Sequence, residues 1–331
     1  ISSGGTAREF YSAQINKSTN TAQLTLQGNL TTTTALTITR GQLNTHATNS
    51  RSLDVGSSLT IAANGTLEPN GSAIDVTGAL TNNGTVTGGT NAVMITVSGN
   101  VVNDGTWADG NLTMDGSSSP TLRGNFTGSS AVTITGGAAV TLSGTTQMTS
   151  LTLAAASASS LNTSAGNSYA LTVNGSIVNN SGCTLIANTS LIKVKTNFTM
   201  SGVFTYGAST VEFFESGDSQ LLLAGSLVAS LTVNKSQSTD KVTLLTNCFA
   251  LGAVTITKGI LDTTTSNRIV YSLHDWTIGT DGTFLANGAA HYALQNFTNN
   301  GTFTAGTSIL YLSGTSGNWT LGGTSETSFN N

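Results

Sequence analysis

The densest group of residues that could do chemistry is a cluster of carboxylates and aromatic rings within one short stretch. Its members are Tyr206, Glu212, Phe213, Phe214, Glu215 and Asp218. Two carboxylates that flank a sugar can cleave a glycosidic bond, and aromatic rings offer broad apolar faces to a ligand. The cluster is therefore a candidate ligand-contact loop for a glycan. The interpretation that we favour is an ordinary loop that closes an irregular coil.

Other residues with catalytic or metal-binding chemistry are few and scattered. The histidines are His46, His274 and His291. A zinc site needs three or four ligands, and no third ligand stands at a sensible spacing from any pair of them. The two cysteines, Cys183 and Cys248, stand on neighbouring apolar segments and are predicted to be buried thiols, with a single bridge between them as the alternative. We therefore predict no catalytic residue, no metal ligand and no cofactor-binding residue.

Three Asp-Gly pairs form a second acidic group. They begin at Asp104, Asp109 and Asp115. Asp-Gly is primarily a turn-forming pair, and calcium requires six to eight oxygen ligands. We interpret the pairs as turns, with a calcium site as the alternative.

The composition indicates which secondary structure carries these groups. Thr, Ser, Gly and Asn supply 168 of the 331 residues, and only 8% of the residues are charged. Thr together with Val and Ile favours strands, whereas Gly and Asn favour turns. The net charge of -4 and the scattered Lys and Arg argue against a nucleic-acid partner. No apolar run reaches the roughly 18 residues that a membrane span needs.

A short motif recurs along the whole chain. It consists of an apolar residue, Thr and a second apolar residue, followed by Gly or Asn, as in Leu36-Thr-Ile38 and Val254-Thr-Ile256. Its copies follow one another at a nearly constant step, except for one longer step from Phe198 to Leu231. Alternation with period two sends Leu, Ile and Val inward and Thr outward. A repeat with a step of roughly 20 to 25 residues is typical of one coil of a solenoid.

The sequence thus predicts an all-β fold, a β-solenoid (parallel β-helix-like) of about twelve coils of 21–26 residues. Residues 1–21 are expected to form an N-terminal arm or cap. Residues 22–331 are expected to form the repeat domain, with a longer coil at about 203–230. A series of β-sandwich domains is the alternative, because sandwiches also show closely spaced turn signals.

Two segments carry a resemblance to known repeats. They are Asn296-Phe-Thr-Asn-Asn-Gly-Thr-Phe-Thr-Ala-Gly-Thr-Ser308 and Ala79-Leu-Thr-Asn-Asn-Gly-Thr-Val-Thr87. They resemble the Thr/Gly/Asn-rich β-solenoid repeats of bacterial cell-surface proteins and of phage fibres. The resemblance implies an extracellular or cell-surface location, or alternatively the surface of a virion. It implies a structural or adhesive role and transfers no catalytic residue.

The functional expectation is a non-enzymatic extracellular structural protein. It would form a rod, stalk or filament subunit by stacking and by end-to-end contacts, so self-association into a homo-oligomer is expected. The alternative is an adhesin or a bacteriophage fibre or virion surface protein that binds a host glycan through the 206–218 stretch. A polysaccharide-acting enzyme is the third interpretation. The opening residue, Ile1, suggests a processed secreted protein or a fragment of one.

Overall fold

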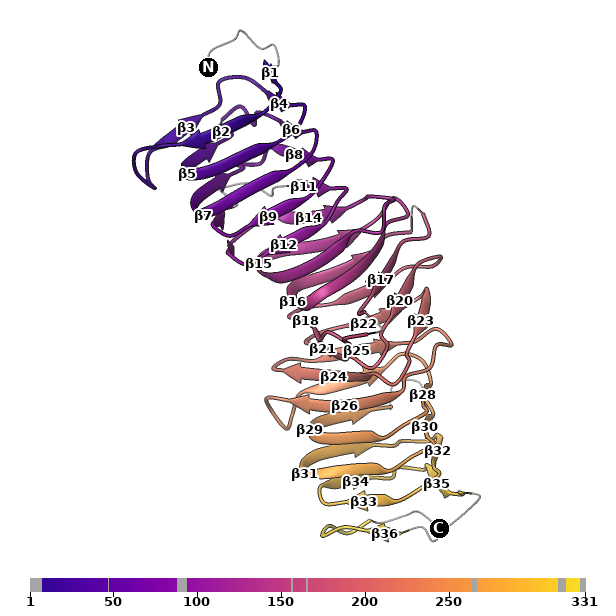
Figure 1. Cartoon of the computed structure of the whole chain (residues 1–331). Coiled ribbons are helices and arrows are strands. Elements are labelled where there is room, and N and C mark those ends of the chain that lie inside the picture. The colour runs from indigo at the N-terminus through magenta and orange to yellow at the C-terminus, as the bar shows by residue number, and fades with distance from the viewer. Residues whose placement is uncertain are drawn as a thin grey trace. The chain divides into compact units, whose positions relative to one another are not determined.

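The computed structural model describes residues 8–327 except 47, 88–93, 156, 165, 264–266 and 315–319. The described chain is all-β without a helix, and its strands pair in parallel to form a β-solenoid of about 14 turns. The chain divides into two compact units, Ile1–Asn162 and Thr163–Asn331, which we describe separately. In each unit the strands of successive coils lie on one another in three stacks (Figure 1).

The first unit contains stacks 1A, 1B and 1C. Stack 1A contains β1 (Arg8–Phe10), β4 (Leu30–Thr32), β6 (Leu53–Val55), β8 (Ala73–Val76), β11 (Met94–Val97) and β14 (Asn111–Met114). Stack 1B contains β2 (Ala13–Asn16), β5 (Leu36–Asn44), β7 (Leu59–Glu68), β9 (Leu80–Asn82), β12 (Val101–Asn103), β15 (Thr121–Ile134), β16 (Ala139–Leu153) and β17 (Ser160–Asn162). Stack 1C contains β3 (Gln23–Thr25), the second halves of β5 and β7, β10 (Thr85–Val86) and β13 (Thr106–Trp107). The long strands β15 and β16 continue past stack 1B: the last residues of β15 pair with β14, and the last residues of β16 pair with those of β15.

The second unit contains stacks 2A, 2B and 2C. Stack 2A contains β18 (Leu171–Val173), β21 (Leu191–Val194), β24 (Thr210–Glu215), β26 (Ser230–Lys235), β29 (Val254–Asp262), β31 (Trp276–Leu285), β33 (Phe297–Asn299) and β36 (Leu321–Gly322). Stack 2B contains β19 (Ile177–Asn179), β22 (Phe198–Met200), β25 (Ser219–Leu222), β27 (Lys241–Leu244), the second halves of β29 and β31, and β34 (Thr302–Thr304). Stack 2C contains β20 (Thr184–Ile186) and β23 (Val203–Thr205), followed by a separate four-stranded sheet of β28 (Cys248–Ala250), β30 (Val270–Ser272), β32 (Ala290–Ala293) and β35 (Ile309–Leu312).

The predicted alternation holds in the strands that carry the motif. In β5, Leu36 and Ile38 are fully buried, and Thr37 between them is half-buried. The next coil repeats this pattern in register, with Leu59 paired to Leu36. Like residues therefore stack on like residues and form a continuous apolar core within each unit.

Buried asparagines and closely packed glycines form a corner in the first unit. Asn82 is fully buried; its Nδ2 donates to Asn103 Oδ1 of the next coil at 2.7 Å, and its Oδ1 accepts the Gly84 N–H at 3.1 Å. A Cβ on Gly84 would lie 2.3 Å from the carbonyl oxygens of Ala62 and Gly65. Only glycine leaves room for the preceding coil at this corner.

The prediction of a longer coil at about 203–230 is wrong. Phe198 pairs with Leu221, and Val211 pairs with Leu231, so both steps have the length of an ordinary coil. The long step in the sequence, from Phe198 to Leu231, arises because Phe198 belongs to stack 2B and Leu231 to stack 2A. The motif has the same form in every stack, so counting its copies along the sequence merges different stacks and gives too few coils.

The predicted N-terminal arm or cap, residues 1–21, contains paired strands. Within it, β1 pairs with β4 and β2 pairs with β5, both in parallel. Residues 8–16 therefore contribute the first described strands of stacks 1A and 1B, and they carry the same in-register pairing as the coils that follow.

Candidate functional site

The predicted ligand-contact residues lie on two turns and on β24. Tyr206 follows β23, and Asp218 precedes β25. Between these turns, the alternation along β24 turns Glu212 and Phe214 outward and Phe213 inward. Phe213 is fully buried in the core. The prediction that Phe213 contacts a ligand is therefore wrong, because this ring packs among the inward residues of neighbouring coils.

The outward side chains of β24 are engaged by cations of the preceding coil. Lys193 Nζ lies 3.3 Å from Glu212 Oε1 and 4.9 Å from the centre of the Phe214 ring. Lys195 Nζ lies 3.3 Å from Glu215 Oε2. Glu212 and Glu215 are thus paired with lysines, and the Phe214 ring is covered by a cation. Asp218 Oδ1 instead accepts the backbone N–H of Lys241 at 2.9 Å.

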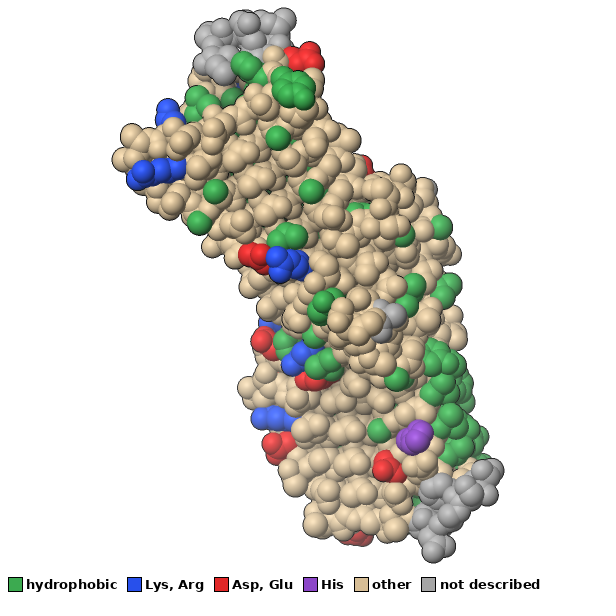
Figure 2. Space-filling model, viewed as in Figure 1, with side chains coloured by type: hydrophobic (Ala, Val, Ile, Leu, Met, Phe, Trp, Pro, Cys, Tyr) green, Lys and Arg blue, Asp and Glu red, His purple; other side chains and the backbone are tan. Residues whose placement is uncertain are grey.

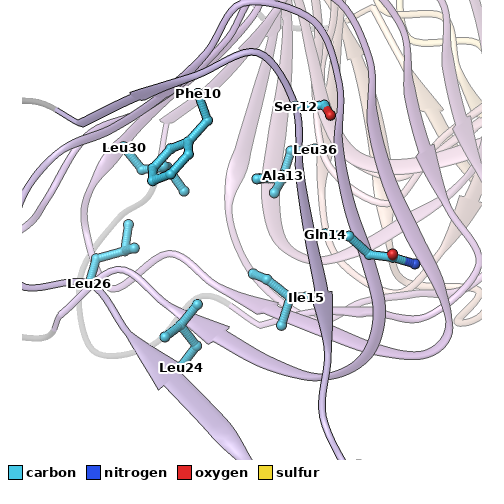
Figure 3. Close-up of a pocket in the computed structure, with 9 residues that line it drawn as sticks. All are labelled: Phe10, Ser12, Ala13, Gln14, Ile15, Leu24, Leu26, Leu30 and Leu36. Carbon is cyan, nitrogen blue, oxygen red and sulfur yellow. The ribbon is translucent and has the colours of Figure 1, made fainter. Parts of the chain in front are cut away.

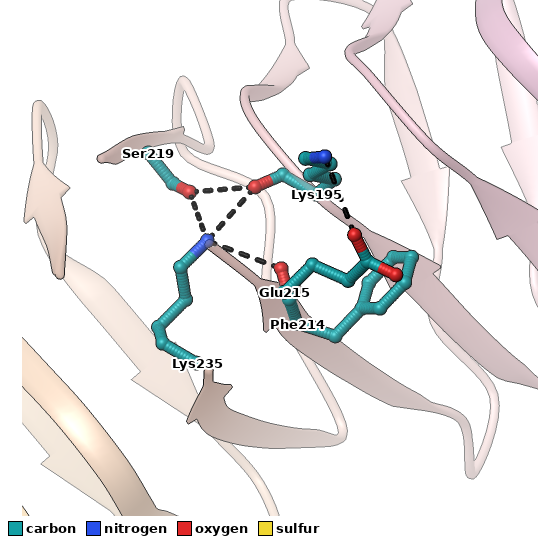
Figure 4. A network of polar contacts seen from close by, with 5 residues as sticks. All are labelled: Lys195, Phe214, Glu215, Ser219 and Lys235. Carbon is teal, nitrogen blue, oxygen red and sulfur yellow. Dashed lines mark hydrogen bonds and ion pairs between the residues drawn. The ribbon is translucent and has the colours of Figure 1, made fainter. Parts of the chain in front are cut away.

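A buried lysine next to this cluster was missed by the sequence reasoning. Lys235, the last residue of β26, is 2% exposed. Its Nζ donates to the carbonyl oxygen of Lys195 at 2.9 Å, to that of Phe214 at 3.1 Å and to Ser219 Oγ at 2.9 Å (Figure 4). Ser219 Oγ donates in turn to the Lys195 carbonyl oxygen at 2.9 Å. All three ammonium protons therefore have an acceptor.

The backbone around Lys235 explains how a cation can be buried here. Glu215 has a φ of 59° and Gly217 a φ of 100°, so the chain turns sharply after Phe214, whose carbonyl oxygen accepts from Lys235. Burial lowers the pKa of Lys235 and is the largest influence on it; the carboxylates of Asp240, Asp218 and Glu215 oppose this effect. The acceptors come from the two coils that precede the coil of Lys235, so Lys235 ties three successive coils together.

A lysine beside a serine hydroxyl can act as a base for nucleophilic catalysis. In this structure the lysine ammonium donates to Ser219, and the serine proton is engaged by the Lys195 carbonyl oxygen. Both side chains are buried, at 2% exposure each. The geometry is that of a closed structural network, in which no donor points toward an open hollow.

His291 is a second buried polar residue. Its Nδ1 accepts the Val270 N–H at 3.2 Å, and its Nε2 lies 2.9 Å from the Ala286 carbonyl oxygen, which fits a neutral ring protonated on Nε2. The ring packs edge-on against Phe284 and Trp276. Burial lowers the pKa of His291, and the hydrogen bond to Ala286 opposes this shift.

This burial predicts acid sensitivity of the second unit. The unfolded chain takes up a proton at His291 near the ordinary pKa of 6.5, whereas the folded chain does so only at lower pH. The unfolded state therefore binds more protons in acid. The contribution of neutral His291 to the free energy of unfolding is complete above pH 6.5, and below that pH the free energy of unfolding falls by up to about 1.4 kcal/mol per pH unit. Urea unfolding between pH 8 and pH 5 measures the slope.

Two variants test the assignment of that acid sensitivity to His291. His291→Gln does not titrate, and we expect it to reduce the loss of stability below pH 6.5. His274→Gln is the control, because His274 is exposed and we expect the slope to stay unchanged. An equal acid slope in the wild type and in His291→Gln would assign the effect to other groups.

Two of the acidic turn residues, Asp104 and Asp115, have an ion-pair or hydrogen-bond partner, and the two cysteines are buried. Asp104 forms an ion pair with Arg123 at 2.6 Å, and Asp115 Oδ1 accepts the Ser98 hydroxyl at 2.8 Å. Within the described part of the chain, no group of three or more His, Cys, Asp or Glu residues could hold a metal ion. Cys183 and Cys248 are both buried, as predicted, and burial raises the pKa of Cys248 to about 12.

Comparisons with protein-family models, with curated proteins and with solved structures found no match to this chain. No described segment forms a helix that could span a membrane.

Proposed function

We propose that this chain is a non-enzymatic structural repeat protein of an extracellular or cell-surface assembly, the surface of a virion being the alternative. It would serve as the subunit of a rod, stalk or filament that is extended by stacking and by end-to-end contacts. The observation that carries the proposal is the in-register stacking of coils. In stack 1B the inward residues follow one another at each step: Leu36, Leu59, Leu80, Val101 and Leu122.

Stacking of this kind suits a mechanical role. Each strand within a stack is hydrogen-bonded to the coil before it and to the coil after it, and these bonds run along the stacking direction. The apolar core runs in the same direction, so separating two coils within a unit breaks backbone bonds and exposes apolar residues together. The buried Lys235 network adds a tie across three coils.

The first described coil presents a surface that can accept further strands. Strands β1, β2 and β3 are paired on one side by β4 and β5. Between them lies an apolar cavity of about 270 Å³, lined among others by Phe10, Leu24, Leu26 and Leu30 (Figure 3). Phe10 is 39% exposed. A strand edge next to an apolar hollow is a typical site for the addition of another strand.

The last described coil of the second unit also presents strands and exposed apolar side chains. β34, β35 and β36 are each paired with the coil before them. Ile309, Leu312 and Leu321 are 55%, 37% and 51% exposed. Parallel coils have different faces at their two ends, so one end can continue the ladder of the other. Such head-to-tail contacts generate open filaments when the rotation does not close.

A charge at the first coil should weaken this end-to-end contact. In Phe10→Lys, an ammonium group replaces a ring that lines the end cavity, and burying it against another coil is costly. We expect the mean length of assemblies of the purified chain to fall several-fold in electron micrographs. The layer spacing along wild-type assemblies should be about 4.8 Å.

Tyr11→Lys is the matched control. Tyr11 is adjacent in sequence and 78% exposed, and it does not line the cavity. We expect its assemblies to keep the wild-type length. Discrete wild-type particles at every concentration, with retention on immobilised glycans, would instead favour the adhesin or phage-fibre alternative.

A further inference from the structure

A row of aromatic side chains follows the separate four-stranded sheet of stack 2C. Phe249, Tyr271, Tyr292 and Tyr311 stand at the same register position of β28, β30, β32 and β35. Their ring centres are 6.1, 5.4 and 4.9 Å apart from one coil to the next. The neighbouring inward residues, among them Cys248 and Ala293, are fully buried, so the aromatic row lies on the outer side of the sheet.

Apolar residues flank this row on both sides. Two positions before the rings stand Ile269, Ala290 and Ile309, and two positions after them stand Leu251, Leu273 and Leu294. The two remaining flanking positions are polar and lie at opposite ends of the row, Asn247 before Phe249 and Ser313 after Tyr311. Ile309 and Tyr311 are 55% and 42% exposed, and the other rings and apolar residues are partly exposed. Figure 2 shows hydrophobic side chains gathered along this part of the second unit. We call the four rings and the six apolar flanking residues the tyrosine face.

The tyrosine face differs from the neighbouring stack of the same unit. The corresponding outward positions of β29, β31 and β33 are Thr255, Thr277 and Thr298. Threonine is the common outward residue of this chain, whereas the tyrosine face contains no Thr, Lys, Arg, Asp or Glu. A continuous apolar patch on an otherwise polar surface marks an interaction site.

We propose that the tyrosine face binds the tyrosine face of a second copy of this chain, side by side. Two identical faces without a charged side chain can pack together without bringing like charges into contact. Both faces carry ridges at the same coil spacing of about 4.8 Å, so the ridges of one copy can lie between those of the other. A twofold axis makes this contact self-complementary.

The ring geometry favours a protein surface over a sugar as the partner. Tyr292 and Tyr311 are stacked with an angle of 11° between their planes. Each of these rings therefore covers a face of the other. A sugar that stacks on an aromatic residue needs an open ring face, whereas packing against another protein uses the ring edges and the flanking Ile and Leu side chains.

The area of the face predicts a weak dimer. Each outward residue occupies about 4.8 Å by 6.8 Å of a sheet, so ten residues cover roughly 330 Å² per copy. Stable interfaces bury about 1,200 Å² or more in total. We therefore expect dimers to form as the protein concentration rises from about 1 μM to about 100 μM. Ile309 belongs to both this face and the end surface described above, whereas the other nine residues of the tyrosine face take no part in the proposed end-to-end contact.

Tyr292→Lys tests the lateral contact, because it places an ammonium group at the centre of the face. We expect sedimentation velocity to show a monomer–dimer equilibrium in the wild type and a dimer dissociation constant at least about tenfold higher in Tyr292→Lys. Both proteins are measured with the Phe10→Lys substitution also present. Failure of the end-to-end proposal and failure of the lateral proposal are then separate results.

Thr277→Lys is the matched control, since it adds the same charge at an outward position of β31. We expect it to dimerise like the wild type, and equal thermal unfolding curves show that all variants are folded. A background protein that is monomeric at every concentration would overturn the proposal. Dimers that persist unchanged in Tyr292→Lys would also overturn it.

Discussion

Replacing Lys235 by alanine is expected to destabilise the second unit by roughly 3–5 kcal/mol, because buried acceptors left without a donor cost about 1–3 kcal/mol each. The substitution removes the donor to the Phe214 carbonyl oxygen and one of the two donors to the Lys195 carbonyl oxygen. It also leaves a cavity where the lysine stem was. Urea unfolding followed by circular dichroism measures the loss.

Lys195→Ala is the control within the same network. It removes the exposed ion pair with Glu215, and it keeps the backbone carbonyl group that accepts from Lys235. Exposed ion pairs contribute at most about 1 kcal/mol. If Lys235→Ala were no more destabilising than Lys195→Ala, the buried ammonium would not tie the coils together.

Gly84→Ala is expected to destabilise the corner of the first unit by about 3 kcal/mol, at the upper end of the cost of overpacking. The added methyl group would lie 2.3 Å from two backbone oxygens, those of Ala62 and Gly65. Backbone atoms cannot rotate away as a side chain can, so the ladder between the two coils must open. Hydrogen exchange followed by mass spectrometry should show faster exchange in peptides that cover residues 61–65 and 82–86.

Gly166→Ala provides the comparison for this substitution. No atom lies within 4 Å of the position that its Cβ would take. We expect its stability to stay the same or to rise by up to about 1 kcal/mol, as the unfolded chain loses freedom. Equal effects of the two substitutions would show that the close approach at Gly84 is relieved at little cost.

Local patterns were sufficient to predict the fold. In Leu36-Thr-Ile38 and Val254-Thr-Ile256 the side-chain period of two assigns each residue to the core or to the surface without knowledge of the partner strand. The same rule places Phe213 and Lys235 inward, because they stand two positions after Val211 and Val233. The period of two in β24 and β26 is therefore sufficient to predict both that Phe213 lies in the core and that Lys235 is buried.

The number of coils could not be obtained in the same way. Copies of the motif occur in all three stacks with the same local form, as Phe198 in stack 2B and Leu231 in stack 2A show. Pairing between strands assigns each copy to its stack, and this pairing joins residues that lie a whole coil apart in the sequence.

The order of residues alone predicts that Leu, Ile and Val form a stacked core under an outer layer of Thr, because inward and outward positions follow from the strand's side-chain period of two. It also displays the recurrence of Phe249, Tyr271 and Tyr292 at nearly equal steps. The stacking of these rings on one another is visible only in the folded chain, as is the contact of the Lys235 ammonium with the carbonyl group of Lys195, two coils earlier in the chain. Such contacts depend on the register between coils, which the length and shape of each turn set and which no local pattern records.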